Sequence, residues 1–139
     1  MNKIIVSILL LLCLYLLETA TVSAETEETC PSIDSVHELI HIWPHGPWLP
    51  LYAENGELAL DVDVKNFSKT AQEFEKAEWS GSFPEMGHCH YKGNAQILLA
   101  RKMLAPDLKK YSSWVIDAKG KLVECDSSNE DECPYGGIG

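Results

Sequence analysis

The chain has 139 residues, 45% of them hydrophobic and 23% charged, with 21 Asp and Glu against 11 Lys and Arg. The resulting net charge of −10 argues against binding to nucleic acid or to an anionic membrane surface, because both are negatively charged. The length fits a single domain that can bury a modest core.

The first residues, 1–24, are predicted to be a signal peptide. A short basic head precedes an apolar run from Ile4 to Leu17, and Val22-Ser23-Ala24 fits the pattern of a signal peptidase site. The run is shorter than the roughly 20 residues of a membrane span. We therefore expect a single mature domain of residues 25–139, exported to the periplasm or secreted, without a membrane anchor; an uncleaved anchor is the alternative.

Four cysteines follow the expected cleavage site, at Cys30, Cys89, Cys125 and Cys133. An even number in an exported chain indicates two disulfides, for which 3 connectivities are possible. We favour Cys30–Cys89 and Cys125–Cys133, because the second pair closes a short loop and the first ties the start of the mature domain to its middle. A zinc cluster around Cys89 is the alternative, although no C-x-x-C spacing is present.

The segment of residues 33–43 fits two kinds of secondary structure. Helical spacing selects Ile33, Val36, Ile40 and Trp43. Alternation selects Val36, Ile40 and Ile42, and Glu38 breaks it. The sequence does not decide between helix and strand here, and a proline-rich stretch ends the element in either case.

Residues 49–53 and 58–64 are expected to pair as a hairpin. Apolar residues alternate in both arms, and Asn55-Gly56 between them favours a tight turn. Asp61 and Asp63 would then lie on a solvated sheet face, with calcium binding as the alternative.

The rest of the chain predicts one helix and two further hairpins. Thr70-Ala71-Gln72-Glu73 fits a capping box and predicts a short helix over residues 70–78. Turn residues between apolar segments predict hairpins over 88–103 and 113–125, and 126–139 is expected to be a loop fixed by its cysteine. The predicted fold class is therefore α+β, mostly antiparallel β hairpins with one short helix, in a disulfide-stabilised single domain.

The placement of cysteines and aromatic residues resembles a known group of proteins. Cys30-Pro31, Cys89-x-Tyr91, a strand led by Trp114, and Cys125 with Cys133-Pro134 are similar to a family of small exported, cysteine-containing bacterial proteins of unknown function. The resemblance implies export and disulfides, and it implies no activity or functional residue.

The segment 37–41 spells H-E-x-x-H, the pattern of zinc peptidases. On a helix, His37 and His41 share a face and can bind zinc, with Glu38 as general base for the zinc-bound water. Pro44 counts against this interpretation because it would end the helix soon after His41. On a strand, the two imidazoles would lie about 13 Å apart, too far for one metal ion.

Two further histidines extend the metal hypothesis. On a strand, His88 and His90 share a face, and a Cys30–Cys89 bond would bring them near His37 and His41. Four histidines together would suit copper or zinc sequestration outside the cell. The third ligand of a zinc peptidase would be Glu73, His88 or His90; surface histidines without a metal are the alternative.

Trp43, Trp48 and Tyr52 lie among prolines and are predicted to form an apolar binding surface for a protein or glycan. Packing over a small core is the alternative role of these residues. The sequence favours a non-enzymatic binding module with no cofactor. The alternatives are a minimal zinc metallopeptidase and an extracytoplasmic metal-binding protein.

Overall fold

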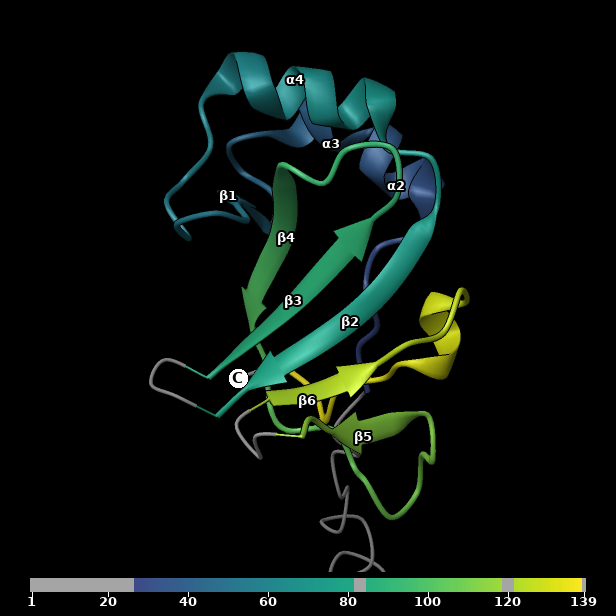
Figure 1. Cartoon of the computed structure of the whole chain (residues 1–139). Coiled ribbons are helices and arrows are strands. Elements are labelled where there is room, and N and C mark those ends of the chain that lie inside the picture. The colour runs from purple at the N-terminus through teal and green to yellow at the C-terminus, as the bar shows by residue number, and fades with distance from the viewer. Residues whose placement is uncertain (1–26, 82–84, 119–121, 139) are drawn as a thin grey trace, which may run out of the picture.

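The computed structural model describes residues 27–81, 85–118 and 122–138 (Figure 1). The predicted signal peptide lies outside these ranges. The described chain is α+β, with a 6-stranded antiparallel sheet, three α-helices and one 3-10 helix. The predicted fold class is confirmed, with more helix than the single short element expected.

The strands follow the order β1-β4-β3-β2-β6-β5 across the sheet. Their bounds are β1 (Leu49–Tyr52), β2 (Phe74–Ser80), β3 (Met86–Tyr91), β4 (Ile97–Lys102), β5 (Trp114–Ile116) and β6 (Leu122–Cys125). The helices are α2 (Ile33–His37), α3 (Leu39–Ile42), α4 (Asp61–Thr70) and the 3-10 helix η1 (Glu130–Glu132). Figure 1 shows α2, α3 and α4 gathered at one end of the sheet.

One face of the sheet carries the core, as the alternation along β3 shows. Gly87, Cys89 and Tyr91 are buried, and the intervening His88 and His90 are partly exposed. Because neighbouring side chains on a strand point to opposite faces, the two histidines lie on the face away from the core. On the core side the Tyr91 ring meets two phenylalanine rings, from α4 and β2, edge to face.

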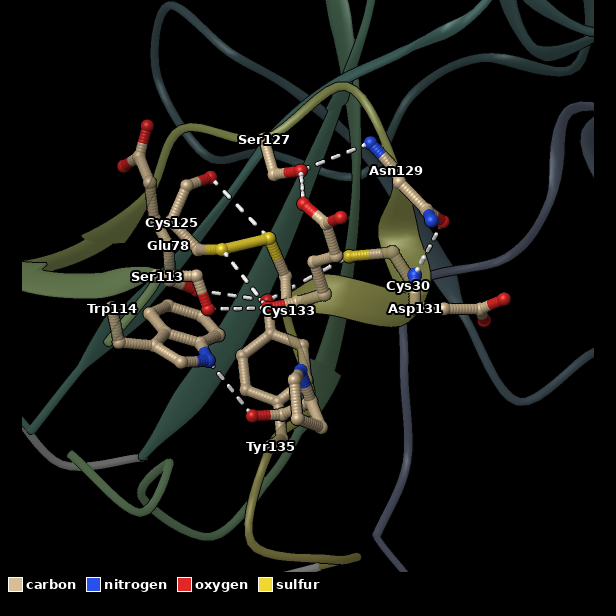
Figure 2. Close-up of a disulfide and its surroundings, with 12 residues drawn as sticks. Cys30, Glu78, Ser113, Trp114, Cys125, Ser127, Asn129, Asp131, Cys133 and Tyr135 are labelled. Atoms are coloured by element: carbon tan, nitrogen blue, oxygen red, sulfur yellow. Dashed lines mark hydrogen bonds between the residues drawn. A yellow bond between two sulfur atoms is a disulfide. The ribbon is translucent and has the colours of Figure 1, made fainter. Parts of the chain in front are cut away.

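Both disulfides join elements to the sheet. Cys30–Cys89 ties the segment before α2 to β3, with an S–S distance of 1.97 Å. Cys125–Cys133 ties the end of β6 to the residue after η1, with an S–S distance of 2.00 Å (Figure 2). These are the two pairs favoured by the sequence, and they indicate an oxidising, extracytoplasmic environment.

The C-terminal segment is held against the sheet by aromatic residues. The Trp114 indole N–H donates to the Pro134 carbonyl at 2.9 Å, and its ring lies 5.2 Å from that of Tyr135 (Figure 2). Tyr135 also forms an isolated bridge with Glu28. Its ring needs a glycine beneath it, because a Cβ at Gly87 would come within 2.8 Å of ring atoms.

The predicted second arm of the first hairpin is wrong. Only Leu58 continues the pairing, through an isolated bridge to Leu51, and the chain from Asp61 onward forms α4. The turn at Asn55-Gly56 is present, and Gly56 adopts a φ of 72°. The alternation of residues 58–64 therefore belongs to a short extended stretch followed by the first turn of a helix.

Tyr52 explains where this helix begins. Its hydroxyl accepts a hydrogen bond from the Leu60 N–H at 3.1 Å and donates one to the Asp63 carboxylate. Asp61 and Asp63 lie in the first turn, where the helix dipole stabilises negative charge. The two aspartates therefore belong to a helix N-terminus and not to a sheet face.

The predicted helix over residues 70–78 is also wrong. Thr70 is the last residue of α4, and the chain from Phe74 to Ser80 is β2, which pairs with β3 and β6. The pairing with β3 is irregular between Phe74 and Lys76. This irregularity puts Phe74 and Ala77, three residues apart, on the same buried face, which imitates helical spacing.

The other two hairpins are confirmed. β3 and β4 pair across the Gly93-Asn94 turn, and β5 pairs with β6. Part of the second turn, residues 119–121, lies outside the described residues. The segment 33–43 is helical, in two pieces separated by a turn at Glu38.

Candidate functional site

The H-E-x-x-H segment spans the break between α2 and α3. The His37 Nε2 lies 2.8 Å from the Ala71 carbonyl oxygen, so this ring N–H donates to the main chain after α4. The His41 Nε2 lies 3.8 Å from the Glu38 carboxylate, and these two side chains are 72% and 74% exposed. The histidines thus have separate partners, and His37 joins α2 to the end of α4.

The second pair of histidines lies on the face of the sheet away from α2. The His90 Nε2 is 2.8 Å from the Glu78 carboxylate, which also lies 3.0 Å from the Lys76 ammonium group. Lys76 reaches Glu124 on β6 at 3.8 Å. Burial lowers the pKa of His88, although the charge of Glu78 opposes this. These side chains form a polar cluster of their own, separate from His37 and His41.

No metal-binding group emerges from these residues. Within residues 27–81, 85–118 and 122–138, no three His, Cys, Asp or Glu side chains lie close enough together to hold a metal ion. His88 and His90 flank the disulfide-bonded Cys89 and point away from it, so the disulfide does not bring them to α2.

The three predicted binding aromatics have different surroundings. The Trp43 indole N–H donates to Asp61 at 2.8 Å, and the Tyr52 hydroxyl donates to Asp63. Both residues thus fix the first turn of α4. Trp48 is only 8% exposed and packs in the core cluster, and it lines a cavity.

That cavity, here called the N-terminal pocket, has a volume of about 440 Å³. It lies between the segment before α2, the two short helices, the loop before β1, and β4. Its apolar lining comes from Leu39, Ile42, Pro47, Trp48 and Leu99. The volume is within the range of about 300–1,000 Å³ that is usual for small-molecule sites.

Two residues of opposite charge also line the N-terminal pocket, Arg101 at the end of β4 and Glu28 on the segment before α2. The Arg101 guanidinium lies 5.9 Å from the centroid of the Trp48 ring, a cation–π contact. Neither Arg101 nor Glu28 has an ion-pair partner within the described ranges. The pocket therefore combines an apolar lining with a cationic and an anionic side chain that do not form an ion pair with each other.

A second hollow near the C-terminus has a different character. It is lined by Lys110, Tyr111, Asp131, Glu132 and two serines. Its cation is already paired, because the Lys110 ammonium group lies 2.9 Å from the Glu27 carboxylate. The N-terminal pocket is the better candidate, since its charged groups are free of such partners among the described residues.

Comparison with protein-family models, curated proteins and solved structures found no match to this chain. The resemblance to small exported bacterial proteins thus stays a prediction. No helix in the described part of the chain is both long and apolar enough to cross a membrane.

Sequence reasoning found Trp48 but missed Glu28 and Arg101. The one local signal for Arg101 is its position directly after the buried run Ile97–Ala100, where a cation ends an apolar strand. Glu28 gives no such signal, because its place in the pocket depends on Cys30–Cys89 and on its bridge to Tyr135.

Proposed function

We propose that this protein is an exported, non-enzymatic binding module that holds a small ligand in the N-terminal pocket. The observation that carries the proposal is a cavity of about 440 Å³ that combines an apolar lining with two residues of opposite charge, neither of which has an ion-pair partner among the described residues. Ligand sites are typically concave and apolar, with a few polar groups that orient the ligand.

A flat aromatic surface for a protein or glycan has less support. Trp43 and Tyr52 use their polar atoms to fix α4, and Trp48 is largely buried. Of the three residues, Trp48 contributes to the pocket, where its ring can form part of an apolar wall.

The zinc peptidase alternative also has less support. A zinc site needs ring nitrogens of both histidines free to turn toward one ion, with Glu38 beside it. Among the described residues no third His, Cys, Asp or Glu side chain completes a metal site with these two histidines, and a turn at Glu38 interrupts the helix between them.

Export is supported by the two disulfides, which persist in oxidising compartments. The signal peptide over residues 1–24 and the final location, periplasmic or secreted, are parts of the proposal. A ligand-binding role outside the cytoplasm is consistent with an acidic domain of this size.

The test is a ligand screen with the mature protein and a variant whose pocket is blocked. Ile42 lines the pocket and is 49% exposed, so Ile42→Trp fills the pocket without disturbing a buried position. Val62→Trp is the matched control, because Val62 is 69% exposed and does not line the pocket.

Thermal unfolding is measured with a panel of amino acids, dipeptides, carboxylates, amines and sugars. We expect at least one class to raise the melting temperature of the wild type and of Val62→Trp, and to leave Ile42→Trp unchanged. The proposal is overturned if no class shifts the melting temperature, or if Ile42→Trp responds as the wild type does.

A further inference from the structure

We infer that the ligand of the N-terminal pocket is a small zwitterion with an apolar body, such as an apolar α-amino acid or a dipeptide of such residues. The inference rests on the proposed function and names its ligand class. Arg101 would bind the carboxylate, Glu28 the ammonium group, and the apolar lining the side chain.

Arg101 is suited to the carboxylate. The guanidinium is permanently charged and can donate two parallel hydrogen bonds to a carboxylate. Its contact with the Trp48 ring holds it at the pocket wall, and it has no carboxylate partner among the described residues. A buried or half-buried guanidinium without such a partner is stabilised when it binds an anionic group.

Glu28 excludes a simple anion as the best ligand. It lines the same pocket as Arg101, and its carboxylate would repel a ligand that carries only negative charge. The whole chain, at −10, opposes the approach of anions as well. A zwitterion has no net charge and can place its ammonium group toward Glu28, so it meets neither obstacle.

The remaining lining selects the body of the ligand. Leu39, Leu99 and Ile42 offer apolar contact, and the Trp48 ring adds a flat wall. Burial of an apolar side chain there stabilises the complex in proportion to the area removed from water. An apolar side chain therefore suits the pocket better than a polar or sugar-like one.

The experiment uses three probes with the same ring. L-phenylalanine carries both charges, 3-phenylpropionate carries the carboxylate alone, and phenethylamine carries the ammonium group alone. Dissociation constants are measured by calorimetry for the wild type, Arg101→Gln and Glu28→Gln. Lys102→Gln and Glu54→Gln are charge-matched controls, because both residues are exposed and lie outside the pocket lining.

We expect the wild type to bind phenylalanine at least about tenfold more tightly than either single-charge probe, because each lost charged hydrogen bond costs about that factor. Arg101→Gln should bind phenylalanine no better than phenethylamine, and Glu28→Gln should bind it no better than 3-phenylpropionate. The two control variants should retain the wild-type preference. A Phe-Phe dipeptide included beside phenylalanine distinguishes a free amino acid from a peptide as the source of the zwitterion.

Other outcomes distinguish a failure of the zwitterion inference from a failure of the proposed binding function. If a carboxylate, an amine or a sugar binds best and Ile42→Trp abolishes that binding, the zwitterion is wrong and the pocket function stands. If Glu28→Gln leaves the preference for phenylalanine unchanged, the ammonium contact is refuted. If nothing in the panel binds, the proposed function fails together with the inference.

Discussion

The Glu78 carboxylate allows a quantitative prediction about pH. Its side chain is only 12% exposed and lies 2.8 Å from His90 Nε2 and 3.0 Å from the Lys76 ammonium group. Burial by itself raises the pKa of Glu78, but the contacts with His90 and Lys76 outweigh burial and lower the pKa from 4.5 to about 2. The folded protein therefore favours the charged form of Glu78 more strongly than the unfolded chain does.

The direction of the pH effect follows from this shift. Because the folded pKa is below the unfolded one, the stabilisation is complete above about pH 4.5 and is lost as the pH falls toward about 2. A pKa difference contributes about 1.4 kcal/mol per pH unit to the free energy of unfolding, so the lowered pKa of Glu78 contributes roughly 3 kcal/mol. About 2 kcal/mol of this contribution is lost by about pH 3.

The assay is urea unfolding of the wild type and Glu78→Gln at about pH 5.5 and about pH 3. We expect the free energies of unfolding to differ by roughly 2–3 kcal/mol at the higher pH and by less than half of that at the lower pH. Glu73→Gln is the control, since its ion pair with Lys92 is 59% and 51% exposed and is expected to contribute less than about 1 kcal/mol. A difference for Glu78→Gln that is the same at both pH values would refute the reasoning.

Two further predictions concern the two disulfides and the hydrogen bonds of the Tyr52 hydroxyl. Replacing both cysteines of Cys30–Cys89 by alanine should cost about 4 kcal/mol of unfolding free energy, and replacing those of Cys125–Cys133 about 2–3 kcal/mol, because the sequence separations are 59 and 8. Urea unfolding measures both, and equal losses would contradict the loop-length argument. Tyr52→Phe should lower the free energy of unfolding and speed amide hydrogen exchange in α4, because the Leu60 N–H and the Asp63 carboxylate lose their partner.

The control for Tyr52→Phe is Tyr111→Phe. The Tyr111 hydroxyl also donates to a carboxylate, that of Glu27, which lies on an exposed segment away from α4. This variant should leave hydrogen exchange in α4 unchanged. Equal acceleration in both variants would show that loss of a tyrosine hydroxyl acts globally and not at the start of the helix.

The parts of the fold that the sequence predicted are those decided by local residues. The β3–β4 hairpin follows from a turn in which Gly93 takes a φ of 89°, where a Cβ would come within 2.4 Å of the Thr70 carbonyl oxygen. The two disulfide pairs were predicted from the expected export and from the closeness of Cys125 and Cys133 along the chain.

The secondary-structure predictions are wrong where contacts with residues distant along the chain determine the local structure. Val62 and Val64 fit a strand as well as a helix, and the choice depends on the Tyr52 hydroxyl, which belongs to another element. Phe74 and Ala77 have helical spacing only because the β2–β3 register is irregular. The pocket was not predictable for the same reason, since the sheet and a disulfide bring the segments of Glu28 and Arg101 to one pocket.

The bridge between Glu28 and Tyr135 places a constraint on the order in which the pocket can be completed. The Tyr135 N–H donates to the Glu28 carbonyl at 2.8 Å, so a residue near the last part of the chain holds the segment that forms one wall of the pocket. A nascent chain in which Tyr135 has not yet been synthesised lacks this hydrogen bond. If the proposed function is right, ligand binding requires the chain to have been synthesised as far as Tyr135, and a chain truncated before Tyr135 should bind poorly even with every lining residue present.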